Sequence, residues 1–101
     1  MSLTIHQKLI ALALQQPTGI EKVIQLISTL TEQELKVLIY LADDLTAVDI
    51  GKAMRIKPKS VANYKGRIVE NLQLSDCRAL RRFALQQQEL LHLIKKEALK
   101  N

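Results

Sequence analysis

Residues 46–72 read TAVDIGKAMRIKPKSVANYKGRIVENL, and the breaks within this stretch decide the fold. Thr46 is followed three residues later by Asp49, a spacing that caps the start of a short helix of about residues 47–54. A tight basic connection, Arg55-Ile56-Lys57, comes next. Pro58 then opens a longer helix, because proline is favoured at the first helical position, where its missing N–H is not needed. Two helices joined in this way are the layout of a helix-turn-helix.

The longer helix, about residues 58–72, has two different faces. At about 100° per residue, one face carries the apolar side chains Val61, Tyr64, Ile68 and Leu72. The opposite face carries Lys59, Asn63, Gly66 and Glu70, flanked by Ala62 and Arg67. Binding in the major groove needs low bulk for close approach, an amide that can pair with adenine, and cations for the phosphates. The pattern therefore favours insertion into DNA over a face that is merely solvated.

Helix starts upstream of this stretch are marked by a threonine with an acid three positions later. Thr18 precedes Glu21 and Thr31 precedes Glu34, and both pairs have the spacing of a capping box. In such a box the hydroxyl caps an amide of the first turn while the acid reaches back to the N-cap amide. We therefore predict one helix that starts after Thr18 and another that starts after Thr31.

Apolar residues recur at helical spacing from these starts and predict amphipathic helices. The stripes are Ile5, Leu9, Leu12 and Ala13, then Ile20, Val23, Ile24, Ile27 and Leu30, then Leu35, Leu38, Ile39 and Ala42. The doubled acid Asp43-Asp44 ends the third helix. With three Gly and two Pro in 101 residues, the chain has little material for hairpins. We predict an all-α fold in which one or two amphipathic helices precede the helix-turn-helix.

The net charge of +5 is unevenly distributed along the chain. Residues 1–50 carry three lysines and six acids, whereas residues 51–101 carry twelve Lys or Arg and four acids. No acid occurs between Gly51 and Val69, the segment that contains the basic connection. A polyanion is therefore expected to bind the second half. The alternative is a solvated cationic surface without a partner.

Composition indicates one small globular domain, with 48% hydrophobic and 25% charged residues. The longest unbroken apolar run, Leu9 to Leu14, falls far short of the roughly 20 residues that a membrane span needs, so we expect no membrane association.

Cys77 is the single cysteine and cannot form an internal disulfide, which is typical of a cytoplasmic protein. We expect it to be a buried or half-buried structural thiol.

Residue patterns for catalysis or metal binding are not found. His6 and His92 sit at opposite ends, with no cysteine or acid at metal-ligand spacing. Glu32 and Glu34 belong to a helix start, where the helix dipole favours anions, rather than to a catalytic pair. The sequence contains neither a glycine-rich phosphate loop nor a nucleophile motif. We expect no enzyme activity, no metal, no cofactor and no small-molecule ligand.

Four blocks occur in order between Leu30 and about Phe83. They are LTEQELKVL at 30–38, DIG at 49–51, IKPKSV at 56–61, and then Tyr64, Ile68 and Leu72. Their order and spacing resemble the LuxR/GerE-type helix-turn-helix of bacterial transcription regulators, over about half of the chain. The usual pattern of that family has Leu-Thr-x-Arg-Glu, Glu-Ile-Ala, Ser-x-x-Thr-Val-x-x-His and Ile-x-x-Lys-Leu at these places.

The chain departs from the family pattern at several positions. Lys57 replaces a capping serine, Tyr64 replaces the histidine, and Asn71 replaces the lysine before Leu72. Asp44 occupies the place of a glycine that ends the first helix of the family in a left-handed conformation, which Asp tolerates better than most residues do. These changes leave the fold expectation intact and bear on which DNA site is preferred.

The resemblance implies a cytoplasmic, sequence-specific transcription regulator whose helix of about residues 58–72 enters the major groove of double-stranded DNA. By matched position, the base-facing residues are Ala62, Asn63 and Gly66, with Asn63 as the best direct reader. The implied phosphate contacts are Lys57, Lys59, Ser60, Lys65 and Arg67. Family members usually carry a receiver or autoinducer-binding domain as well, for which we expect no room in 101 residues.

Apolar residues continue after Ser75 without a breaker and predict one helix of about 20 residues, longer than the fourth helix of the family. An approximate coiled-coil seam would be formed by Leu80, Phe83, Ala84, Leu90, Leu91 and Ile94. The same residues would also suit packing against the N-terminal helices of the same chain. We favour a homodimer, because the resemblance implies pairing through this helix.

The predicted organisation has three parts. Residues 1–29 form an N-terminal helical extension, residues 30–84 the helix-turn-helix domain, and residues 85–101 a C-terminal helical extension for dimerisation. Two functions fit this organisation. The first is a homodimeric DNA-binding regulator. The second is a helical protein interaction module that binds a regulatory protein and has weakened DNA binding. The acid-free basic segment favours the first.

Overall fold

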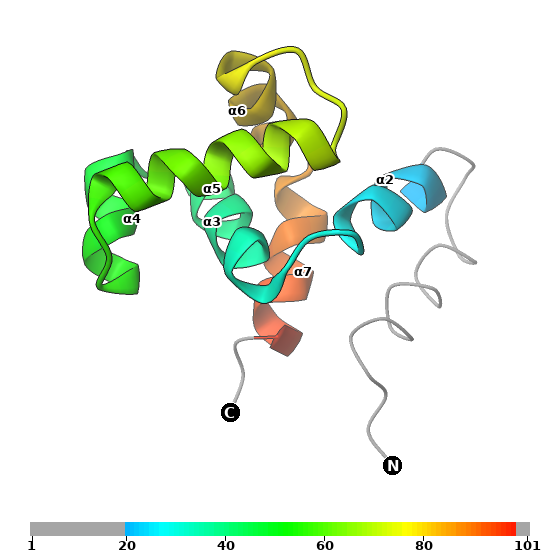
Figure 1. Ribbon diagram of the computed structural model, residues 1–101. Coiled ribbons are helices and arrows are strands. Elements are labelled where there is room, and N and C mark those ends of the chain that lie inside the picture. The colour runs from blue at the N-terminus through cyan, green and yellow to red at the C-terminus, as the bar shows by residue number, and fades with distance from the viewer. Residues whose placement is uncertain (1–19, 99–101) are drawn as a thin grey trace.

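The computed structural model describes residues 20–98, and all the secondary-structure elements in that range are helices. They are α2 (Ile20–Ile27), α3 (Glu32–Ala42), α4 (Ala47–Met54), α5 (Pro58–Asn71), α6 (Cys77–Gln86) and α7 (Gln88–Ala98). Figure 1 shows α5 running across the molecule, with α4 at one end of it and α6 beside it. The predicted all-α class is confirmed. The helix predicted around residues 5–13 and the cap predicted at Thr18 lie outside the described residues.

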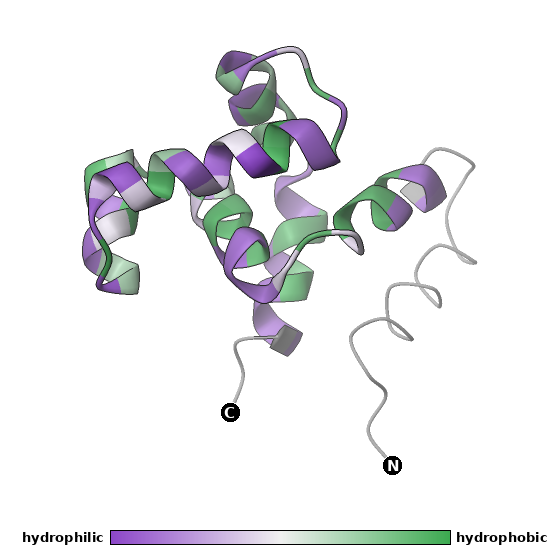
Figure 2. Ribbon diagram, viewed as in Figure 1, coloured by the Kyte–Doolittle hydropathy of each residue, from purple (hydrophilic) through white to green (hydrophobic). Residues whose placement is uncertain are grey.

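The central helix is α3, which packs against α4, α5, α6 and α7. Its buried apolar residues are Val37, Leu38, Ile39, Leu41 and Ala42. These side chains point in several directions around the helix, so α3 can contact neighbours on more than one side. Burial of a leucine or isoleucine contributes about 1.5–3 kcal/mol each, which makes α3 the framework that positions the other helices. Figure 2 shows the contrast with α5, where hydrophilic and hydrophobic residues alternate as in a helix with one buried side.

The predicted capping box at the start of α3 is confirmed. The Thr31 hydroxyl accepts from the Glu34 N–H at 3.2 Å, and Glu34 Oε1 accepts from the Thr31 N–H at 3.0 Å. At the start of α4, Thr46 Oγ1 likewise accepts from the Asp49 N–H at 3.2 Å. The Asp49 carboxylate does not reach back to the N-cap amide and accepts from the Thr46 hydroxyl instead. Aspartate is one methylene shorter than glutamate, so this second start is a cap without the full reciprocal box.

The end of α3 also follows the sequence prediction. Asp43 is the C-cap, and Asp44 has φ 62°, the left-handed conformation expected at the place of the family's glycine. The turn that follows carries the chain directly into α4. Two other non-glycine residues, Arg55 and Gln73, have positive φ at the ends of α4 and α5. A residue in the left-handed region therefore stands at the C-cap of α4 and directly after the C-caps of α3 and α5.

The prediction of a single C-terminal helix of about 20 residues is wrong. The helix is interrupted at Gln87, which caps the end of α6 before α7 begins at Gln88. The Gln88 side chain donates from Nε2 to the Ala42 carbonyl at 2.9 Å, which satisfies one of the carbonyls left without a partner at the end of α3. Because the chain changes direction here, Leu80 and Ala84 of α6 and the apolar residues of α7 all reach the core around α3.

Asp43, at the end of α3, contacts two residues of α7. Its Oδ1 lies 2.7 Å from His92 Nε2, and its Oδ2 accepts from Lys95 Nζ at 3.1 Å. Partial burial raises the pKa of the Asp43 carboxyl, but the hydrogen bonds and charges of His92 and Lys95 outweigh that effect and hold the pKa below its ordinary value of 3.8. Arg81 of α6 pairs with the neighbouring Asp44. Both acids at the end of α3 therefore bind the C-terminal helices.

Candidate nucleic-acid interface

The turn between α4 and α5 brings these helices into close contact. Arg55 takes the left-handed conformation, with φ 59° and ψ 44°, and its N–H points to the carbonyls of Gly51 and Lys52. A Cβ at Gly51 would lie 2.7 Å from the Ile56 carbonyl oxygen, so only glycine permits this approach of the turn to α4. The sequence shows only that Gly51 stands in the DIG block where the family pattern has alanine, whereas the structure shows a packing requirement.

The start and the inner face of α5 agree with the sequence. Pro58 occupies the first turn, and the N-cap Lys57 makes no side-chain capping hydrogen bond. Val61, Ile68 and Leu72 are buried in the core, and Tyr64 is half-buried against it. The predicted inner face of the helix of residues 58–72 is therefore confirmed, and the opposite face must point to solvent.

The exposed face of α5 contains the predicted base-facing residues. Ala62, Asn63 and Gly66 are all exposed. Among the predicted phosphate contacts, Lys57, Lys59 and Arg67 are exposed, whereas Ser60 and Lys65 are half-buried at the edges of the face. The structure thus brings the eight residues together along one helix and the residue before it.

Gly66 is not required by the packing of the chain. A Cβ built at Gly66 meets no atom within 4 Å. A glycine in a helix interior costs roughly 0.5–1 kcal/mol relative to alanine, so its presence needs another reason. Low bulk on the exposed face of α5 is consistent with close approach to a ligand.

Tyr64 and Arg67 form a pair that sequence reasoning missed. The Arg67 guanidinium carbon lies 5.9 Å from the centroid of the Tyr64 ring, within the range of a cation–π contact. The ring therefore helps to hold the guanidinium beside the exposed face of α5. An aromatic residue three positions before an arginine in a helix is the sequence signal that could have revealed it.

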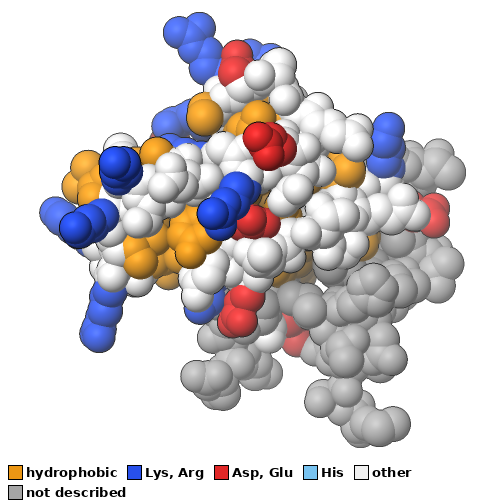
Figure 3. Space-filling view, in the orientation of Figure 1, with side chains coloured by type: hydrophobic (Ala, Val, Ile, Leu, Met, Phe, Trp, Pro, Cys, Tyr) orange, Lys and Arg blue, Asp and Glu red, His pale blue; other side chains and the backbone are white. Residues whose placement is uncertain are grey.

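Positive charge gathers at one end of the molecule. Figure 3 shows Lys and Arg side chains over α4 and the first part of α5, at the left of the view. The cations of this segment are Lys52, Arg55, Lys57, Lys59, Lys65 and Arg67, and none of them is in an ion pair among the salt bridges of the described residues. A surface with this charge attracts a polyanion.

The residues predicted for dimerisation pack within the described chain. Leu80, Ala84, Leu90, Leu91 and Ile94 are buried within the single chain, and Phe83 is half-buried against the same core. The described chain buries this set by packing within itself, which is the alternative that fits the same spacing. The change of direction at Gln87 is the physical reason, because it turns the apolar residues of α7 toward α3.

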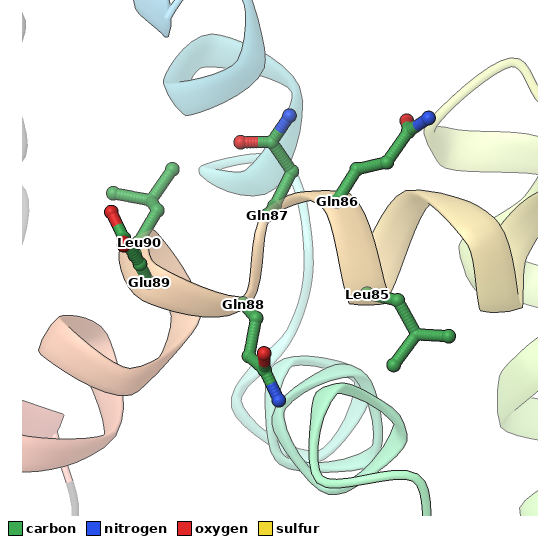
Figure 4. Close-up of a pocket in the computed structure, with 6 residues that line it drawn as sticks. All are labelled: Leu85, Gln86, Gln87, Gln88, Glu89 and Leu90. Carbon is green, nitrogen blue, oxygen red and sulfur yellow. The ribbon is translucent and has the colours of Figure 1, made fainter.

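The outer side of this bend is polar. Figure 4 shows a shallow pocket at the junction of α6 and α7, where Gln86 and Gln87 point to one side and Leu85 and Gln88 to the other. Glu89 and Leu90 complete the lining, and because Leu90 is buried the exposed surface here is mostly polar. Among the residues that line the bend, Leu85 is therefore the large apolar side chain that remains exposed to another chain.

Other residues considered for chemistry lie apart from one another. Cys77 is exposed at the start of α6, which corrects the expectation of a buried thiol. Within residues 20–98, no group of three or more His, Cys, Asp or Glu side chains is placed to hold a metal ion. No helix in the described part of the chain is long and apolar enough to cross a membrane.

Comparison with known proteins gives one match. The model of the family described as bacterial regulatory proteins, luxR family, matches residues 28–84. This range contains α3, α4, α5 and most of α6. Searches of curated proteins and of solved structures found no significant match.

Proposed function

The chain belongs to the luxR family of bacterial regulatory proteins, and from this membership we propose that it inserts α5 into the major groove of double-stranded DNA and reads a specific sequence there. The family is one of DNA-binding transcription regulators. The proposal assigns base contacts to Ala62, Asn63 and Gly66. Phosphate contacts are assigned to Lys57, Lys59, Ser60, Lys65 and Arg67.

The main support for DNA reading by α5 is the composition of its exposed face. Its inner face is fully used by the core, yet its outer face combines Asn63 with Gly66, a glycine that the fold does not need. An asparagine amide can pair bidentately with adenine. The neighbouring cations supply the sequence-independent attraction to phosphates. A face that only needed to be soluble would gain stability from alanine in place of Gly66.

Pairing of two copies is part of the proposal. Two α5 helices about one turn of DNA apart would read a palindromic site. The surface that pairs must use residues outside the buried set of α6 and α7, and Leu85 and Leu93 are the apolar side chains of these helices that remain exposed, at 41% and 51%. We further propose that the protein acts in the cytoplasm, where bacterial DNA is found.

Selection of bound sequences from a random DNA pool tests the proposal directly. We expect enrichment of one palindromic sequence. The affinity for it should fall with salt with a log–log slope of about −5 to −7, as for neutralisation of about six to eight phosphates by a dimer. Sedimentation of the complex gives the stoichiometry. A flat salt response, or a pool that stays random, would contradict the proposal.

A further inference from the structure

A surface hollow of about 360 Å³ lies between α3 and α4. It is lined by Gln33, Lys36, Tyr40, Ala53, Met54 and Arg55. Tyr40 and Met54 are half-buried and pack against the core, so their outer surfaces form an apolar floor. Figure 3 shows hydrophobic surface between α4 and α3 with Lys and Arg side chains on both sides of it. The hollow therefore combines an apolar floor with a cationic rim.

The cations at the edge of the hollow, Lys36 and Arg55, are able to bind an anion. Lys36 has Glu32 as a partner on the same helix, but their charged atoms are 3.9 Å apart, and the Glu32 side chain is 82% exposed. This separation exceeds a direct hydrogen bond, and the contact is of the weak kind made by exposed pairs. Arg55 lies on the opposite side of the hollow, at the end of α4. A carboxylate could therefore bind at either side of the floor.

The hollow lies beside the surface assigned to DNA, and Arg55 is the lining residue that it shares with the cations of residues 52–67. None of its lining residues belongs to α5, and none is among the residues proposed to contact bases or phosphates. The apolar floor would be of no use to a phosphate backbone, which is charged along its whole length. A protein segment can use both features, because it can carry an apolar side chain between two acids.

We propose that this hollow docks an acidic segment of another protein. One leucine or phenylalanine side chain of that segment lies on Tyr40 and Met54, and carboxylates on either side of it meet Lys36 and Arg55. The volume is at the lower end of the range of small ligand sites, about 300–1,000 Å³, and suits one anchoring side chain. This interaction goes beyond DNA reading and does not depend on it.

The test uses the full chain, labelled with ¹⁵N, and two short synthetic peptides. The first has one phenylalanine between pairs of glutamates, and the second has lysines in place of the glutamates. We expect the acidic peptide to move the amide signals of Gln33, Lys36, Ala53 and Met54 at millimolar concentration, while the lysine peptide moves none of them. No binding of the acidic peptide, or equal binding of both, would overturn the proposal.

Three variants separate charge from shape. Lys36→Glu should weaken the acidic peptide about ten-fold, because it exchanges attraction for repulsion at the rim. Ala53→Arg should also weaken it, although this change adds positive charge, because the longer side chain fills the hollow. Lys22→Glu on α2 is the control with the same change of charge outside the hollow, and it should retain affinity within about two-fold. If Lys22→Glu weakens binding as much as Lys36→Glu, the attraction is not local and the proposal fails.

Other occupants are distinguished in the same spectra. If the hollow signals move with protein concentration alone, a second copy fills the site. If duplex DNA moves the signals of Gln33 and Lys36, which lie on α3 away from the start of α5, the nucleic acid fills it. Either result would overturn docking of an acidic partner. Failure of DNA reading would instead appear as loss of sequence selection, with the peptide response unchanged.

Discussion

Asn71, at the end of α5, donates a hydrogen bond from its Nδ2 to Glu34 Oε1, 3.3 Å away, near the start of α3. The same oxygen accepts from the Thr31 N–H, and Glu34 is only 4% exposed. One buried carboxylate therefore closes the start of α3 and holds the end of the helix proposed to enter DNA. Asn71 replaces the lysine of the family pattern, and the structure shows that its amide provides a hydrogen bond there.

Replacement of Glu34 should destabilise the fold. Glu34→Ala leaves the Thr31 N–H and the amide of Asn71 without their shared acceptor, at a cost of about 2 kcal/mol. Asn71→Ala should cost about 1 kcal/mol, because the carboxylate keeps its bond to Thr31. Thermal unfolding measures both. The neighbouring exposed Glu32→Ala is the control and should change stability by less than about 0.5 kcal/mol; an equal loss in this control would contradict the assigned role.

The features that the sequence predicted well depend on residues close together in the chain. The caps at Thr31 and Thr46 and the opening of α5 by Pro58 each involve contacts within about four positions, whereas the left-handed Asp44 was expected from its matched place in the family pattern. The exposed face of α5 followed from helical periodicity in the same way. A local pattern is sufficient in these cases because the hydrogen bonds that fix the geometry are themselves local.

The features that the sequence did not predict depend on distant partners. The break at Gln87 is not marked by a glycine or proline in the sequence. The hydrogen bond from Gln88 to the Ala42 carbonyl spans 46 positions. The apolar spacing from Leu80 to Ile94 fits a seam between chains as well as packing within one. Only the position of α3 decides between these possibilities. The Asn71 to Glu34 bond was missed for the same reason, since it spans 37 positions.

Truncation of a leucine on α7 tests whether that helix belongs to the core of one chain. Leu91 is fully buried, so Leu91→Ala should cost about 2–5 kcal/mol by loss of apolar burial and creation of a cavity. Unfolding by urea should give this loss at every protein concentration. The exposed Leu93→Ala is the matched control and should cost far less. A loss that grows on dilution would instead place Leu91 between two chains.

Asp43 should make stability depend on acid pH. Its pKa is lowered in the folded chain, so the ionised carboxylate favours folding above the ordinary value of 3.8. That contribution is lost as the pH falls below this value and through the lowered one. Asp43→Asn should therefore cost about 1 kcal/mol or less near neutral pH and nothing once the wild-type carboxyl is protonated. Urea unfolding of both proteins from pH 7 to pH 2.5 measures this difference.

Gly66→Ala should raise the stability of the fold and weaken DNA binding. The added methyl group meets no atom of the chain, so the helix should gain roughly 0.5–1 kcal/mol of stability. On DNA the same methyl group should weaken binding to the selected sequence more than to random duplex, because it stands where α5 approaches the bases. Differential scanning calorimetry and fluorescence anisotropy measure the two effects. Gain of stability with unchanged DNA affinity would show that Gly66 does not lie in the groove.

Asn63→Ala and Lys59→Ala should have different effects on DNA binding, although both residues are exposed on the same helix. An amide that pairs with a base edge carries sequence information, whereas an ammonium group near a phosphate carries only charge. Asn63→Ala should cost about 1–3 kcal/mol on the selected site and little on random DNA. Lys59→Ala should weaken binding to both DNAs about equally and reduce the salt slope by about one.

The core variant Val61→Ala completes this comparison. Val61 is fully buried on the inner face of α5, so its truncation should lower the unfolding temperature before it changes the ratio of specific to random binding. Salt-dependent anisotropy on the selected and random duplexes provides the measurement for all three variants. If Asn63→Ala weakens both DNAs alike, or neither, the assigned recognition face is wrong. The helix would then have to be rotated so that Tyr64 and Lys65 face the groove, and the same pair of measurements on their alanine variants would test that orientation.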